Sequence, residues 1–99
     1  MKGDEFKRIG AKVESVHQLQ RLKLLQDFTP EPNVYVYPQI LQLQDKQYMK
    51  NWCENVRMVW AITFPQSVQT DINDIELRVF DKETGDLLCR YINGEVVIS

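Results

Sequence analysis

Two turn signals near the C-terminus constrain the fold of this chain more than any other feature. They lie in the stretch DIELRVFDKETGDLLCRYINGEVVIS, residues 74–99. Asn93-Gly94 is a preferred pair for a two-residue type I′ turn, because both central residues of that turn need positive φ. Gly85 suits a hairpin loop that ends in a left-handed residue. The pattern therefore predicts three strands joined by two hairpins, the last strand covering residues 95–99.

The last of these strands lacks the features that protect an open sheet edge. Natural edge strands carry charges, prolines or bulges that discourage pairing with other molecules. Val96, Val97 and Ile98 are apolar and uncharged. Two alternatives follow: the strand is internal to the sheet, or it pairs with another molecule. This choice is the main functional clue in the sequence.

Length and composition indicate an ordinary small protein. The 99 residues are expected to form one domain, residues 1–99, with one modest core. The net charge of −2 provides no broad attraction for phosphate, whereas proteins that coat nucleic acid are usually basic. There is no apolar run typical of a signal peptide and none approaching the ~18 residues of a membrane span. A cytoplasmic location without membrane contact is expected.

A long amphipathic helix is predicted over about residues 4–27. Asp4 is its expected N-cap, and no proline occurs before Pro30. Apolar residues recur at spacings of three and four, as on one face of a helix: Phe6, Ile9, Val13, Val16, Leu19, Leu22 and Leu25. A proline-containing connector follows at residues 28–33.

The remaining sheet region, residues 34–99, begins with a predicted strand at 34–43. Its β-branched and aromatic residues favour a strand, and Pro38 in its middle indicates an edge position or a bulge. Residues 45–55 fit either a short helix capped by Asp45 or a continuation of that strand. The spacing of Tyr48, Trp52 and Val56 favours the helix.

The segment RMVWAITF, residues 57–64, is almost uniformly apolar after its first residue. Such a run is typical of a central strand covered on both faces, so a strand is predicted here. The resulting fold class is a single α+β domain. Its N-terminal amphipathic helix packs on a four- to five-stranded antiparallel or mixed sheet that ends in a three-stranded meander.

Residue types that carry catalysis or bind metals are sparse. His17 is the only histidine, and Cys53 and Cys89 lack the spacing of a redox or metal motif. Both cysteines are expected to be reduced and buried. No catalytic, metal or cofactor site is predicted, so an enzyme is not expected.

The favoured functional hypothesis is a non-enzymatic protein–protein interaction or adaptor module that forms a homodimer or binds a protein partner. Its interface would use the last strand and the exposed part of the long helix. The expected interface residues are Val96, Val97, Ile98, Leu22 and Leu25.

A nucleic-acid-binding regulator is the first alternative. Tyr35 and Tyr37 alternate on a predicted strand and would share a face on which bases stack. Three arginines on predicted strands would contact phosphates: Arg57, Arg78 and Arg90. Acidic residues in the same part of the chain argue against this alternative. A small ligand-binding protein or enzyme, with a pocket near Cys53 or His17, is the second alternative.

Overall fold

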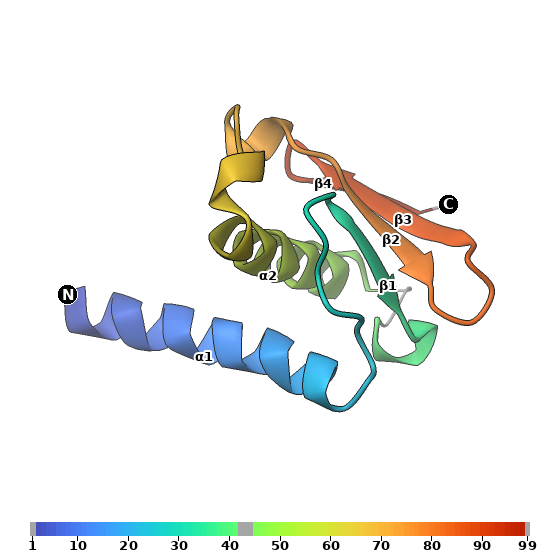
Figure 1. The fold of residues 1–99 in the computed structure, drawn as a ribbon, viewed down its shortest axis with the longest axis horizontal. Helices are drawn as coiled ribbons and strands as arrows, with labels where there is room; N and C mark the ends of the chain where they lie inside the picture. Colours follow the sequence, from blue (N-terminus) through green and yellow to red (C-terminus); the bar gives the residue numbers. More distant parts are fainter. Residues whose placement is uncertain (1, 42–44, 99) are drawn as a thin grey trace.

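A four-stranded mixed sheet carries two helices on one of its faces (Figure 1). The computed structural model describes residues 2–41 and 45–98. In chain order the elements are α1 (Lys2–Arg21), β1 (Asn33–Val36), η1 (Pro38–Ile40), α2 (Lys46–Thr63), η2 (Pro65–Ser67), η3 (Ile72–Asp74), β2 (Leu77–Asp81), β3 (Leu87–Ile92) and β4 (Glu95–Ile98). The predicted α+β fold class, with an N-terminal helix, a four-stranded sheet and a C-terminal meander, is confirmed.

The strands are ordered β1-β2-β3-β4, with β1 parallel to β2 and the last three strands antiparallel. The two hairpins have the backbone that their turn residues predict. Gly85 has a φ of 79°, and the Asn93-Gly94 turn has φ values of 52° and 77°. The meander therefore follows from local turn chemistry.

The central strand predicted at residues 57–64 is wrong, because residues 57–63 belong to the second half of α2 and Phe64 is its C-cap. Buried side chains recur along the helix at spacings of one, three and four: Trp52, Cys53, Val56, Val59 and Trp60. Ile62, on another side of the helix, is 58% exposed. The favoured helix over 45–55 is confirmed, and the Asp45 side chain accepts a hydrogen bond from Tyr48 N at 3.0 Å.

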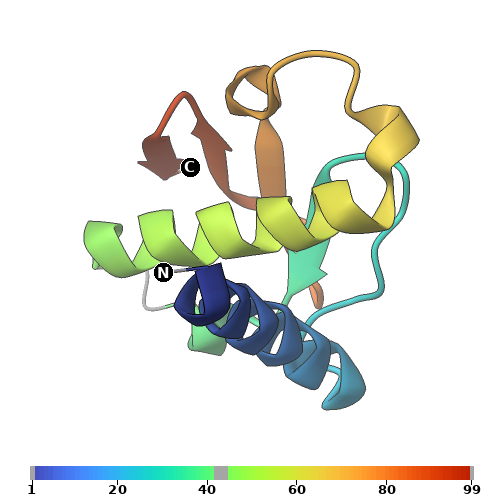
Figure 2. The same cartoon turned by 90° about the vertical axis from the view of Figure 1, so that its left-hand side faces the viewer.

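The topology also requires a crossing element at this point of the chain. Parallel neighbours such as β1 and β2 cannot be joined by a tight hairpin, so the chain must cross one face of the sheet. The helix α2 makes that crossing, and α1 packs beside it (Figure 2). The second helix is therefore much longer than the short one expected.

The first helix ends earlier than the predicted residue 27. Lys23 has a φ of 63°, Lys23 N donates to Gln20 O at 3.1 Å, and Leu24 N donates to Leu19 O at 3.0 Å. These two bonds around a left-handed residue form a Schellman motif, which terminates a helix. Glycine is the usual residue at the left-handed position of this motif. Because this chain has lysine there, no glycine in the sequence indicates that the helix ends at this point. The predicted cap at Asp4 is also wrong, because α1 already begins at Lys2.

The predicted strand 34–43 is shorter than expected, since β1 ends at Val36 and η1 begins at Pro38. Residues 42 and 43 of that prediction, like Ser99 of the last strand, lie outside the described residues. The expected edge position is confirmed, because β1 is the first strand in the sheet order.

One hydrophobic core lies between the sheet and the helices. It contains residues from both helices, the α1–β1 link and the first three strands, with Val36, Met49, Val56 and Leu77 fully buried. Trp60 Nε1 donates to Thr29 O at 2.9 Å and so fixes the connector against α2. Within the described residues, no helix is long and apolar enough to cross a membrane.

Candidate interaction site

The strand β4 forms one edge of the sheet. It pairs with β3 in the register Ile92↔Glu95, Tyr91↔Val96, Arg90↔Val97 and Cys89↔Ile98. In a two-residue hairpin the pair that flanks the turn exchanges both hydrogen bonds, and alternate pairs do so thereafter. The N–H and C=O groups of Val96 and Ile98 therefore point away from β3, toward the outside of the sheet. No described residue hydrogen-bonds to them there.

The opposite edge is covered. After the Schellman turn, residues 24–26 run alongside β1, and we call them the β1 cover. Gln26 N donates to Tyr35 O at 3.0 Å, and Tyr37 N donates to Leu24 O at 3.1 Å. Leu25 bridges to Val36 and is 1% exposed. The outward-facing C=O of Tyr35 and the N–H of Tyr37, directly after β1, are therefore hydrogen-bonded within the chain.

The side chains of β4 are mostly apolar and partly exposed. Val97 is 41% exposed and Ile98 is 38% exposed, whereas Val96 is half-buried and packs on the core. Glu95, at the start of the strand, is its only charged residue. Of the two alternatives for this strand, the internal position is wrong, since β4 lies at an edge.

The two leucines expected to join this interface lie elsewhere. Leu25 is a core residue, so its assignment to an interface is corrected. Leu22 is 56% exposed, but it lies in the turn after α1, in the segment that leads to the β1 side of the sheet. The expected interface residues therefore do not form one continuous surface.

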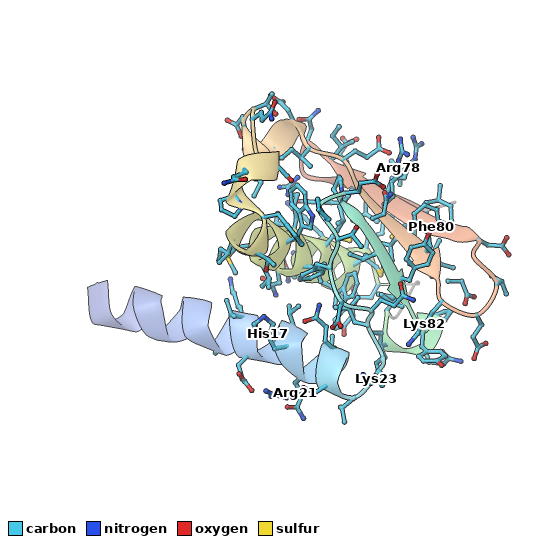
Figure 3. The ribbon with its side chains drawn as sticks, viewed as in Figure 1. His17, Arg21, Lys23, Arg78, Phe80 and Lys82 are labelled. Carbon is cyan, nitrogen blue, oxygen red and sulfur yellow. The ribbon has the colours of Figure 1, made fainter. Side chains whose placement is uncertain are left out.

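The sheet face opposite the helices brings together three of the five residues proposed to contact nucleic acid. Arg78 lies directly opposite Arg90 in the β2–β3 register. Tyr35 stacks on Phe80, with ring centroids 5.1 Å apart and an interplanar angle of 20°. Arg78 and Phe80 extend from the sheet on the side away from α1 (Figure 3). Sequence reasoning missed Phe80, which reaches Tyr35 only through the parallel β1–β2 pairing.

This face, which we call the outer face, also contains a shallow depression of about 420 Å³. It is lined by Glu76, Arg78, Phe80, Leu87, Arg90, Val97 and Ile98. Arg78 Nε and Glu76 Oε1 form an ion pair at 2.8 Å. Among the described side chains, residues 10–41 and 45–98, no ion pair to Arg90 is formed, so its guanidinium charge is available to an anionic ligand.

The other two candidates for nucleic-acid contact have local structural roles. Arg57 is 5% exposed, lies over the Tyr91 ring at 4.8 Å and donates to Ile75 O at 3.3 Å and Asn73 Oδ1 at 3.4 Å. It therefore holds the η3 segment against α2, and its expected contact with phosphate is wrong. Tyr37 lies under the Lys82 ammonium, which is 5.3 Å from its ring centroid.

Tyr91 links β3 to α2. Its hydroxyl donates to Glu54 Oε1 at 2.6 Å. Burial, together with this hydrogen bond to a carboxylate, raises the pKa of Tyr91 to about 12. The phenol is therefore neutral at physiological pH and serves as a hydrogen-bond donor beneath the sheet.

Side chains of the types used in catalysis do not converge on one site among the described residues. Cys53 and Cys89 are free and buried, and the pKa of Cys53 is raised by its hydrogen bond with Cys89 and by burial. A thiol in this state is a poor nucleophile. His17 is exposed on α1 (Figure 3). Among the described residues, no cluster of three or more histidine, cysteine or carboxylate side chains could hold a metal ion.

Comparison with known proteins assigns no relative to this arrangement. No family model matches the chain, no curated protein matches its sequence, and no solved structure matches its fold.

Proposed function

We propose that this protein is a small, non-enzymatic interaction module that binds another protein molecule by strand addition at the β4 edge, and that it self-associates. The observation that carries the proposal is the outward orientation of the N–H and C=O groups of Val96 and Ile98. Exposed edge groups of this kind supply the main-chain hydrogen bonds by which sheets accept an extra strand. The neighbouring apolar side chains would add buried area to the contact.

The contrast between the two sheet edges supports this proposal. A covered β1 edge leaves β4 as the place where a strand can join the described sheet. The edge also lacks the lysine, proline or bulge with which monomeric proteins block such pairing. A cytoplasmic location is part of the proposal, and the two free, buried cysteines are compatible with a reducing compartment.

The test compares two substitutions at Ile98 by size-exclusion chromatography with light scattering. Ile98→Pro removes an N–H that faces the free edge and leaves the bonds to β3 in place. Proline is tolerated at such edge positions. Wild-type protein at high micromolar concentration should be larger than the 11.7 kDa monomer, and Ile98→Pro should run as a monomer.

Ile98→Val is the matched control, because it keeps the N–H and a β-branched side chain. It should associate like wild type. Circular dichroism must show the same folded signal for all three proteins. A wild-type monomer at high micromolar concentration, or an Ile98→Pro variant that associates normally, would contradict the proposed self-association through β4.

A second candidate function, binding of single-stranded nucleic acid, is favoured by one specific observation. The outer face combines the Arg78–Arg90 pair with the stacked rings of Tyr35 and Phe80. Cationic and aromatic side chains together are what single-stranded nucleic acid requires. Fluorescence anisotropy with a labelled oligonucleotide should then show salt-dependent binding that Arg90→Gln weakens and Arg21→Gln, on α1, does not. Equal binding by both variants would remove this candidate.

A further inference from the structure

We infer that the strand added at the β4 edge is β4 of a second copy of this chain, antiparallel and in the register that places Val97 opposite Val97 of the second copy. The inference rests on the proposed function, since it names the partner that the β4 edge receives. It goes further by fixing the symmetry of the assembly and the residue on its two-fold axis.

The backbone hydrogen bonds select this register. Val96 and Ile98 offer one outward N–H and one outward C=O each, as the pairing with β3 requires. With Val97 on the axis, Val96 of each copy faces Ile98 of the other. All four outward groups of each strand then pair, giving four inter-chain hydrogen bonds.

A neighbouring symmetric register satisfies fewer of these groups. Placing Val96 opposite Val96 of the second copy would bring Ile98 opposite Gly94. Gly94 belongs to the hairpin turn and has a φ of 77°, so its backbone is not extended. It cannot continue a ladder, and the outward groups of Ile98 would remain unpaired.

The side chains of β4 are compatible with the same arrangement. Val97 lies on the outer face beside Arg90, and in the dimer it would contact Val97 of the second copy. Val96 would lie beside Ile98 of the second copy on the helix side. The strand's one charged residue, Glu95, is two positions from the axis, so the pairing opposes no like charges at its centre.

The β1 cover determines where this assembly stops. Two copies joined by a two-fold axis use the same edge of each sheet, and both outer edges are then β1 strands flanked by residues 24–26, which bridge to Val36. An isologous contact of this kind closes after two subunits. The expected product is an eight-stranded sheet with the helices of both copies on the same side.

Disulfide cross-linking of Val97→Cys tests the register directly. Residues opposite each other in a non-hydrogen-bonded antiparallel pair have Cα atoms ~4.5 Å apart, within the roughly 4.4–6.8 Å that a disulfide spans. Treatment with oxidised glutathione should convert most of the variant to a species of twice the monomer mass on a non-reducing gel. Wild type should remain monomeric on the same gel, because Cys53 and Cys89 are buried.

Glu95→Cys is the matched control on the same strand. In the inferred register its two copies lie about four residues, or ~13 Å, apart along the strands, too far for a disulfide. A dimer by light scattering that cross-links through Glu95→Cys and not through Val97→Cys would overturn the register and leave self-association intact. A wild-type monomer would overturn the register together with self-association.

Discussion

At one edge of the sheet, β1 is flanked by residues 24–26, which hydrogen-bond to it and bury Leu25. At the other edge, Val96 and Ile98 of β4 direct their backbone groups outward. Both edge strands are four residues long, and Glu95 of β4 is the one charged residue on either of them. The difference between them is made by a three-residue segment that lies beside one strand only. The way in which α1 ends therefore determines which edge of this small sheet is open to an additional strand.

Removing the side chain that anchors the β1 cover should have the largest effect. Leu25→Ala deletes a buried side chain in the core, and such changes cost about 2–5 kcal/mol of unfolding free energy. Urea denaturation followed by circular dichroism would measure the loss. Leu22→Ala, three residues away and 56% exposed, should change stability by less than ~0.5 kcal/mol. Equal effects of the two substitutions would show that the cover is not anchored by Leu25.

The hairpin that presents β4 should be the next most sensitive point. Gly94→Ala forces an L-residue into a backbone with a φ of 77°, at a cost of about 1–2 kcal/mol. Gly10→Ala has equally open surroundings, since nothing lies within 4 Å of either added Cβ. Because Gly10 lies in the middle of α1, where alanine favours a helix more than glycine does, Gly10→Ala should raise the unfolding free energy by up to ~1 kcal/mol. Thermal unfolding of both variants should therefore shift in opposite directions; shifts of the same sign would argue against the turn assignment.

Removing the phenol that holds β3 to α2 should have a smaller effect. Tyr91→Phe keeps the ring under the sheet and deletes the bond to Glu54, so a loss of about 1 kcal/mol is expected. The pKa of Tyr91 is raised from 10.0 to about 12 in the folded protein, so folded protein retains the phenolic proton that unfolded chains lose. Wild-type stability should therefore fall as pH rises through this window. The difference between wild type and Tyr91→Phe should shrink across it, and a constant difference would contradict the raised pKa.

The smallest expected change tests the turn that directs the chain to the β1 edge. Lys23→Gly relieves a left-handed lysine at the end of α1 and should raise the unfolding free energy by about 0.5–1 kcal/mol. The bond from Lys82 Nζ to Lys23 O, 3.0 Å long, uses the backbone and should persist (Figure 3). Calorimetry would measure the gain. A loss of stability in Lys23→Gly would mean that the lysine side chain stabilises the protein by more than its left-handed backbone destabilises it.

The parts of the fold that could be predicted from sequence are those with local chemical causes. Gly85 and the Asn93-Gly94 pair indicate the two hairpins directly, because few other residues adopt their backbone angles. Asp45 likewise indicated a helix start. The left-handed stop at Lys23 carries no such residue signal, and the prediction therefore extended α1 by six residues.

The error over residues 57–64 has a different origin. Judged alone, a segment that is almost uniformly apolar after Arg57 fits a buried strand as well as a helix. Dividing the chain at residue 56 removed the helical repeat that joins Trp52 to Trp60. The assignment of Arg57 to a phosphate contact followed from that division. The Tyr35–Phe80 stack depends on a parallel pairing between distant segments, which no local pattern specifies. The edge position of β4 likewise depends on strand order.

The parallel pairing of β1 with β2 has a consequence for how the chain acquires its structure. The two strands are separated by the whole of α2 and the η2–η3 region, whereas each C-terminal hairpin closes over a few residues. Closing the longer loop costs more chain entropy, so the hairpins are expected to form early and β1 to dock late. During synthesis, β1 leaves the ribosome about 40 residues before its neighbour. Until β2 emerges, the apolar side chains of β1 have no sheet neighbour against which to pack. The length of the nascent chain should therefore determine when the protein becomes resistant to proteolysis.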